Sequence, residues 1–275
     1  MRGATRGTIF RLERPIRDAW TRVYEQMSDF DRGLARPTSA VAPDMAVDAG
    51  LRAFMLGVYN KVALGLVLSA ALAWVTGNYP PARALLFQVD GYGRVGYTIL
   101  GMVVAFAPLA ILLFQAFARK ASPRSAAITY WVIVAAIGAS FGMLFQIYAG
   151  ASIAQTFLVT AIAFGGLSLV GYTTKRNLQA MGSFLIMGLW GLIVAMLVSM
   201  FFHSAAMVFA INAIGVLIFA GLIAWDTQRL KLMYYQLGGD QAAMSVATSY
   251  GALSLYLDFV NLFRFLLYFM GGSRR

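Results

Sequence analysis

Cysteine is absent from this 275-residue chain, and histidine occurs once, at position 203. The missing thiols exclude disulfides and thiolate metal sites, and a single imidazole disfavours a histidine-based metal centre. Charged residues are also scarce, at 12% of the chain, whereas a typical soluble domain has about 25%. Hydrophobic residues make up 60% of the sequence, and its mean hydropathy is +0.71. This composition predicts an all-α protein that lies in a lipid bilayer.

Acidic residues are the scarcer charged type, and their positions are informative. Seven of the eleven precede Leu51, and two others, Asp90 and Asp240, fall in glycine-containing polar stretches. Only Asp226 and Asp258 remain within or at the edge of long apolar runs. A charge at the centre of a membrane-spanning helix costs about 2.5–3.5 kcal/mol on insertion scales, so such a residue is a functional hypothesis by default.

Long apolar segments begin after residue 50. A helix needs about 20 residues to cross about 30 Å of hydrocarbon. The segments that meet this length lie near residues 54–76, 97–117, 126–148, 153–173, 180–202, 206–228 and 245–270. The sequence therefore predicts a polytopic membrane domain of seven transmembrane helices over residues 51–272, with mostly short loops that make successive helices antiparallel neighbours.

The first 50 residues differ from the rest, since they are polar and carry eight arginines. They contain no compact apolar region with a cleavage site, so they are not predicted to be a signal peptide. Apolar residues at three- and four-residue steps in 8–28 suggest an amphipathic helix on an anionic membrane surface, or else a mobile tail with a transient helix. Residues 29–49 are interpreted as a linker.

The net charge of +11 has a simple explanation in the membrane. Basic residues gather in the tail and in every second connection between apolar segments, so the positive-inside rule predicts a cytoplasmic N-terminus. Nucleic-acid binding is therefore not expected. The basic residues of those connections are Arg119, Lys120, Arg124, Lys175, Arg176, Arg229 and Lys231.

Polar residues on the last two predicted helices share helical faces. Ser254, Asp258 and Asn261 stand at i, i+4 and i+7 on the seventh helix, among Leu, Phe, Tyr and Val. Asn212 and Asp226 are fourteen residues apart on the sixth, close to four turns. One polar line on an otherwise apolar helix is typical of a helix at the middle of a bundle or beside a water-filled cavity. The depths of the two carboxylates match only if the sixth helix continues beyond residue 229 or the seventh starts late.

Two carboxylates that meet in a low-dielectric site cannot easily both ionise, so Asp226 and Asp258 would share a proton and titrate as a pair. The ionised pair would attract a cation, which gives a transient calcium contact, whereas the protonated pair could close a pore by hydrogen bonding. Arg119, at the end of the second span, is the candidate for holding one carboxylate ionised. Two plainer interpretations stay open, namely that Asp226 is an interfacial residue and that Asp258 makes a buried structural hydrogen bond.

Enzymatic alternatives find little support in the motifs. A membrane aspartic protease would use two intramembrane aspartates, but its Gly-Asp context is missing, since Trp225 precedes Asp226 and Leu257 precedes Asp258. A rhomboid-like dyad would need His203, which falls in a short loop beside Ser204. The sequence contains no nucleophile elbow, zinc-protease motif or phosphate loop. We expect a protein that is not an enzyme and has no cofactor.

At these residues the chain resembles the Bax inhibitor-1 (transmembrane Bax-inhibitor-motif) family. The run LYLDFVNLF at residues 255–263 is similar to the family's signature on its last helix. The run WDTQ at residues 225–228 looks like the family's Tyr-Asp-Thr-Gln segment with Trp in place of Tyr. Residues 119–120 and 127–130 are also similar, and the resemblance covers residues 51–272, not the tail.

The resemblance implies six helices around a central seventh and a pH-sensitive calcium leak in a bacterial inner membrane. In this family, the positions of Asp226 and Asp258 hold the proposed proton sensor, and Arg119 would engage one of them in the closed form. Ser254, Asn261 and Asn212 would support the pair. Some bacterial members instead bind and restrain a membrane-bound AAA protease, so the alternative function is a non-conducting regulator with such a partner or a stress-response complex.

Overall fold

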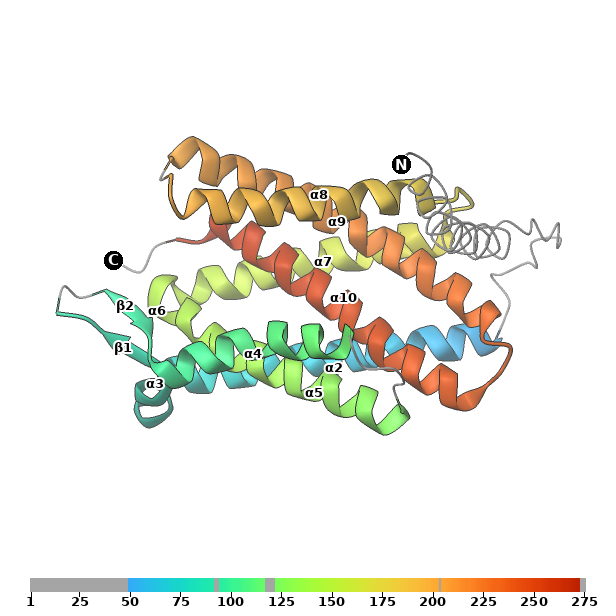
Figure 1. Ribbon diagram of the computed structural model, residues 1–275, viewed down its shortest axis with the longest axis horizontal. Coiled ribbons are helices and arrows are strands. Elements are labelled where there is room, and N and C mark those ends of the chain that lie inside the picture. Colours follow the sequence, from blue (N-terminus) through green and yellow to red (C-terminus); the bar gives the residue numbers. More distant parts are fainter. Residues whose placement is uncertain (1–48, 92–93, 117–121, 203, 273–275) are drawn as a thin grey trace, which may run out of the picture. The chain divides into compact units, whose positions relative to one another are not determined.

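The computed structural model describes residues 49–91, 94–116, 122–202 and 204–272, and these form a bundle of long helices with one small hairpin (Figure 1). Several predictions fall outside this part of the chain: residues 1–48 of the predicted polar domain 1–50, with its amphipathic segment and nearly all of its linker, Arg119 and His203. Residues 49 and 50 belong to the first helix instead. The elements are α2 (Ala49–Asn78), α3 (Pro80–Leu86), β1 (Phe87–Val89), β2 (Val95–Tyr97), α4 (Ile99–Ala116), α5 (Pro123–Ser140), η1 (Phe141–Met143), α6 (Leu144–Ile147), α7 (Gly150–Thr173), α8 (Gln179–Ser199), α9 (Ala205–Gln236) and α10 (Gln241–Met270).

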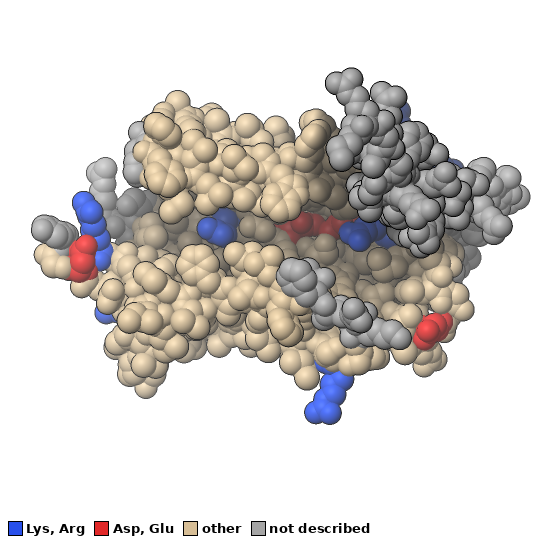
Figure 2. Space-filling model, viewed as in Figure 1, with Lys and Arg blue, Asp and Glu red and all other residues tan. Residues whose placement is uncertain are grey.

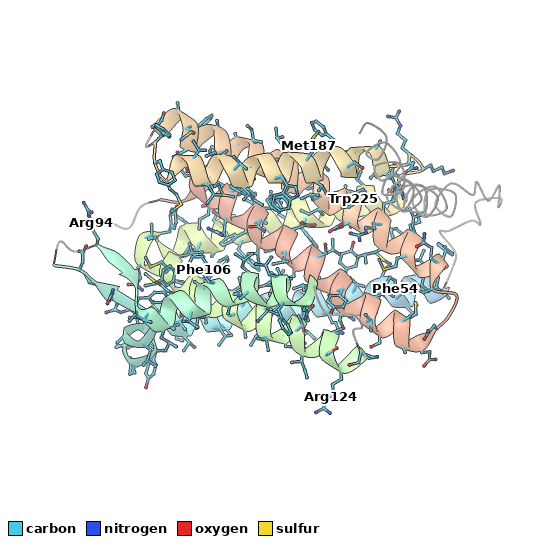
Figure 3. All side chains as sticks on the ribbon, in the orientation of Figure 1. Phe54, Arg94, Phe106, Arg124, Met187 and Trp225 are labelled. Carbon is cyan, nitrogen blue, oxygen red and sulfur yellow. The ribbon has the colours of Figure 1, made fainter. Side chains whose placement is uncertain are left out.

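Six helical segments in the described residues are long and apolar enough to cross a membrane: α2, α5 with its continuation to Ile147, α7, α8, α9 and α10. The shorter apolar helix α4 lies within the predicted second span, so the count of seven is not confirmed. Large apolar side chains cover the outside, as Phe106 on α4 and Met187 on α8 illustrate (Figure 3). An all-α polytopic membrane fold accounts for this exposed apolar surface, because lipid replaces water around it.

Helix α10 has the most enclosed position among these segments. It packs against α9, α2, α5 and α7. In its most apolar 18-residue stretch 56% of the residues are buried, against 17–39% in the corresponding stretches of the other five candidate spans. Its buried aromatic residues fill the middle of the bundle, where the Phe259 ring packs edge-on against Phe157 and Phe164. Helix α8 packs chiefly on α9, and α4 chiefly on α5.

The boundaries of α9 and α10 explain how they meet. Helix α9 runs to Gln236, past the predicted end at residue 228. A turn follows in which Gly238 and Gly239 adopt φ of 57° and 88°, the left-handed region that glycine enters without strain. Asp240 then caps α10 by accepting hydrogen bonds from the backbone N–H groups of residues 242 and 243. Helices α9 and α10, which carry the two predicted carboxylates, are therefore antiparallel neighbours joined by a tight turn.

A β-hairpin that the sequence analysis did not anticipate follows α3. Strands β1 and β2 are antiparallel, with Phe87 opposite Tyr97 and Val89 opposite Val95. The rings of Phe87 and Tyr97 lie 5.5 Å apart. We call this end of the bundle the hairpin end. The opposite end, which holds the α7–α8 and α9–α10 connections, is the basic end.

Candidate functional site

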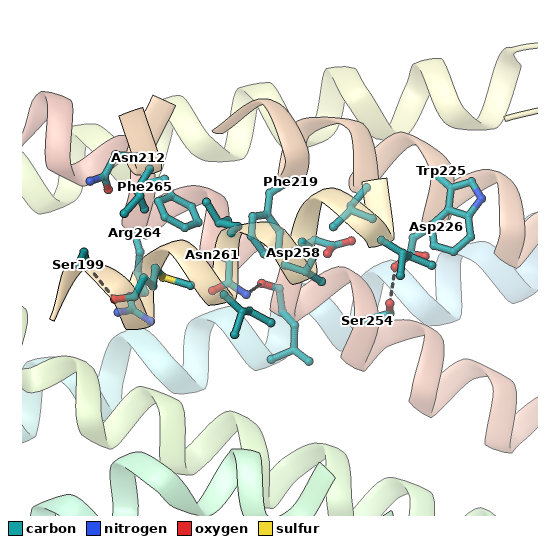
Figure 4. Close-up of a pocket in the computed structure, with 18 of the residues that line it drawn as sticks. Ser199, Asn212, Phe219, Trp225, Asp226, Ser254, Asp258, Asn261, Arg264 and Phe265 are labelled. Carbon is teal, nitrogen blue, oxygen red and sulfur yellow. Dashed lines mark hydrogen bonds between the residues drawn. The ribbon is translucent and has the colours of Figure 1, made fainter. Parts of the chain in front are cut away.

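The structure brings the two predicted carboxylates together. Asp226 on α9 and Asp258 on α10 are 5% and 6% exposed. Side chains on a helix lean toward its N-terminus, and α9 and α10 are antiparallel, so the Asp226 side chain leans toward the hairpin end and that of Asp258 toward the basic end. The two carboxyl groups lie close enough to interact with each other electrostatically. Figure 4 shows them side by side.

The partners of the two groups differ. Ser254 donates a hydrogen bond from Oγ to Asp226 Oδ2, and Arg229 Nη1 lies 3.9 Å from Asp226 Oδ1. Asp258 Oδ2 is buried, and no N–H or hydroxyl group of the described residues donates a hydrogen bond to it. Because buried polar atoms in native structures are nearly always paired, a proton held between the two carboxyl groups is the natural partner for this oxygen. The geometry therefore suits a pair that carries one proton.

The pair faces a cavity of about 690 Å³ between α8, α9 and α10. In the space-filling view it appears as a cleft in which acidic side chains lie between two groups of basic ones (Figure 2). Its wall on α8 is mostly apolar. Its polar lining is Ser199, Asn212, Asp226, Arg229, Ser254, Asp258, Asn261 and Arg264. We call it the carboxylate groove.

The predicted supporting residues all line this groove. Ser254 contacts Asp226 directly. Asn261 Nδ2 donates to the carbonyl of Leu257 at 2.9 Å, and Asn212 Nδ2 donates to the carbonyl of Val208 at 2.7 Å. Each side-chain amide thus donates one N–H to a carbonyl of its own helix. No described residue donates a hydrogen bond to the Oδ1 atom of either asparagine. The two amide oxygens continue the row of oxygen atoms from the carboxylates toward the hairpin end.

Two arginines of the groove were not assigned to the site from the sequence. Arg229 was placed in a loop, but it stands three residues after Asp226 within α9. Arg264 follows Asn261 by three residues and so extends the same polar line. The pKa of Tyr97 on β2 is raised by burial, and the charge of Arg264 opposes this, which places that cation near the hairpin. The i+3 spacing was the available signal in both cases.

The basic end of α9 is tied to the loop before α8. Gln228 Oε1 accepts a hydrogen bond from the N–H of Leu178 at 2.8 Å, and its Nε2 donates to the carbonyl of Arg176 at 2.7 Å. Lys231 Nζ donates to the carbonyl of Tyr172 at 2.7 Å. These three bonds fix the helix segment that begins two residues after Asp226, so the carboxylate stands on rigid backbone.

The groove offers few ligands for a resident metal ion. The described residues contain no group of three or more His, Cys, Asp or Glu that could hold one. Calcium takes about 6–8 oxygen ligands, whereas the groove supplies two carboxylates with the hydroxyl of Ser254 and the amide oxygen of Asn261. Such a set fits a hydrated cation that passes or rests briefly better than one that is held.

Comparison of the sequence with known proteins identifies relatives of this chain. The family described as "Inhibitor of apoptosis-promoting Bax1" matches residues 51–275. An uncharacterised protein of Caulobacter vibrioides is 61% identical over 90% of this chain and all of its own length. The inner membrane protein YbhL of Escherichia coli K12 is 40% identical, covering 82% of this chain and 94% of YbhL. The family match extends through both carboxylate helices, and the chain belongs to the Bax inhibitor-1 family.

Proposed function

We propose that this membrane protein is a pH-sensitive calcium leak of a bacterial inner membrane, gated by Asp226 and Asp258, and that it is not an enzyme. One observation carries the proposal: two buried carboxyl groups from neighbouring helices contact each other inside a groove that is otherwise lined by apolar side chains and a few polar ones. The inner-membrane location is inferred from the similarity to YbhL.

Protons and calcium would compete for the same two oxygen-bearing groups. With one shared proton, the pair is hydrogen-bonded and holds α9 against α10. Loss of that proton leaves two negative charges in a poorly screened site, which repel each other and attract a divalent cation. Calcium flux should therefore rise as pH rises through the titration of the pair.

The basic end would face the cytoplasm. Arg52, Arg124, Lys175 and Arg176 lie at this end of the described bundle, and Arg83 and Arg94 lie toward the hairpin end. The excess of positive charge at one end is the pattern of cytoplasmic loops. In this orientation Asp226 enters the membrane from the cytoplasmic side. Arg119, which lies outside the described residues, remains our proposed partner for a carboxylate in the closed form, alongside Arg229.

Calcium uptake into liposomes that hold the purified protein tests this function. The flux would be measured across about pH 5–8, a range in which buried carboxyl groups can titrate, for wild type, Asp226→Asn and Asp258→Asn. Asp90→Asn is a matched control, because that carboxylate bonds the backbone N–H of Arg94 in the hairpin at 2.7 Å, away from the groove.

A pH-dependent flux that both groove substitutions flatten, and that the control leaves unchanged, is the expected result. The absence of flux above that of empty liposomes at every pH would overturn the leak. The remaining candidate would then be a non-conducting regulator, and a membrane-bound protease should be sought by co-purification with and without residues 1–48.

A further inference from the structure

A second, smaller cavity adjoins the carboxylate groove at the basic end. Its volume is about 350 Å³, and it is lined by Gln179, Ser183, Ile186, Trp225, Gln228, Arg229 and Leu232. We call it the vestibule. Three of its lining residues, Ile186, Trp225 and Arg229, also line the carboxylate groove. These three side chains therefore stand between the two cavities.

Trp225 lines this boundary and packs against α8. A Cβ atom added to Gly182 would collide with the indole of Trp225, so the indole lies directly on the bare backbone of that glycine. The Arg229 guanidinium then covers the indole from α9, with its carbon 5.4 Å from the ring centroid. The boundary thus has a fixed part, held by close packing, and a charged part.

The charged part is the more loosely held. The side chain of Arg229 is 56% exposed, and its Nη1 lies 3.9 Å from Asp226 Oδ1, at the outer limit of an ion pair. Exposed pairs of this kind contribute little stability. The nearby polar side chains are held by short hydrogen bonds instead. Gln228 forms them with the α7–α8 loop, and Lys231 forms one with the last turn of α7. Among these residues, Arg229 is the one that can leave its contacts at the lowest cost.

We infer that Trp225 and Arg229 form a partition whose charged part is removable, and that a hydrated divalent cation from the basic end must displace Arg229 to reach the carboxylate pair. The guanidinium and the incoming cation compete for the same oxygen of Asp226. The vestibule is then the waiting position for the cation. This inference deepens the proposed leak, but it predicts water access, which can be measured without calcium.

The natural absence of cysteine makes the measurement direct. Leu257→Cys places a thiol in the carboxylate groove, and Ser183→Cys places one in the vestibule. Each is labelled with a zwitterionic maleimide, which has no net charge and does not cross the bilayer, added only at the basic end of protein in sealed, oriented vesicles. A neutral reagent reports an open path, because it does not respond to the charge of the arginine itself.

With the partition intact, we expect fast labelling at position 183 and slow labelling at 257. Arg229→Gln should speed labelling at 257 by about fivefold, the factor for loss of one exposed ion pair, and leave the rate at 183 unchanged. Arg229→Lys should keep it slow. Lys175→Gln removes an exposed positive charge outside both cavities and is the matched control.

Gly182→Ala gives a second route to the same answer, since its new methyl group must displace the indole of Trp225. It should also speed labelling at 257. Unchanged rates at 257 in both variants, with normal labelling at 183 as evidence of a folded protein, would overturn the partition. Fast labelling at 257 in the unmodified background would overturn it as well. If the labelling rates at 257 change as expected but the wild-type protein carries no calcium in the liposome assay, the leak is refuted and the partition stands.

Discussion

Replacing Ser254 with alanine should move the pH response of calcium flux without abolishing it. The hydroxyl group of Ser254 donates a hydrogen bond to Asp226 Oδ2. A hydrogen bond to a carboxylate stabilises the ionised form over the protonated one. Without this donor, the pair should release its proton only at a higher pH. The midpoint of the rise in flux should therefore move to higher pH, while the maximal flux stays near that of wild type.

The size of the shift follows from the strength of such bonds in membrane proteins. Hydrogen bonds between transmembrane helices contribute about 0.6 kcal/mol on average and about 1.7 kcal/mol at most. One pH unit corresponds to about 1.36 kcal/mol, so the midpoint should move by about 0.4–1.2 units. The upper part of this range is favoured, because Asp226 is only 5% exposed and water cannot easily replace the lost donor.

The assay is calcium entry into dye-loaded liposomes, with finely spaced pH values around the wild-type midpoint. Ser249→Ala is the control, because this serine lies on the same helix but its Oγ accepts a hydrogen bond from Lys61 Nζ at 2.7 Å instead. A midpoint for Ser254→Ala that is unchanged, or that moves to lower pH, would show that Asp226 is not the group whose ionisation opens the path.

Three further substitutions test how the helices around the site are held, each by thermal unfolding in detergent. Gly138→Val should destabilise the protein by about 1–3 kcal/mol, because even a Cβ there would lie 2.5 Å from the Cα of Ser69; Gly191→Val, with open space around it, should be near neutral. Tyr256→Phe should cost about 0.6–1.7 kcal/mol, because Ser69 Oγ donates to α5 and so must accept from the Tyr256 hydroxyl 2.6 Å away; a double mutant with Ser69→Ala that shows full additivity would contradict this. Lys231→Met should cost about 0.3–1 kcal/mol, since its ammonium group bonds a carbonyl in the last turn of α7, and an unchanged melting temperature would argue against that role.

The sequence predicted the membrane-spanning segments well because their signal is local. Long apolar runs mark them, and the six helices that are long enough to span lie where six of those runs were placed. The end of α9 was placed eight residues early, at 228 instead of Gln236, because Arg229 and Lys231 resemble loop residues when only composition is considered. Lys231 finds its partner 59 residues away on α7, and no local pattern reveals such a contact. The hairpin strands are three residues each, too short for a period of two to stand out.

The polar row on α10 was predictable, and so was the face of α9 that carries Asp226, because both depend only on helical spacing. Their contact required one further fact, the length of α9. Asp226 lies ten residues before Gln236, or about 15 Å, and Ser254 lies thirteen residues after Gln241, or about 20 Å. With a tight turn between the helices, these depths differ by about 5 Å. Because Asp226 leans away from the turn while Ser254 and Asp258 lean back toward it, the side chains can meet.

The arginines beside the pair show where spacing stops being sufficient. Arg229 and Arg264 both stand at i+3 from a polar residue of the row, yet Arg229 reaches the Asp226 carboxylate and Arg264 lines the other end of the groove. Each side chain leans back toward the residue three positions earlier, which is the carboxylate of Asp226 for Arg229 and the amide of Asn261 for Arg264. Gly182 in addition leaves room for the indole of Trp225 beneath Arg229. The proposed partition therefore depends on a glycine of the neighbouring helix as well as on Arg229, because the indole of Trp225 occupies the space that a side chain at Gly182 would fill.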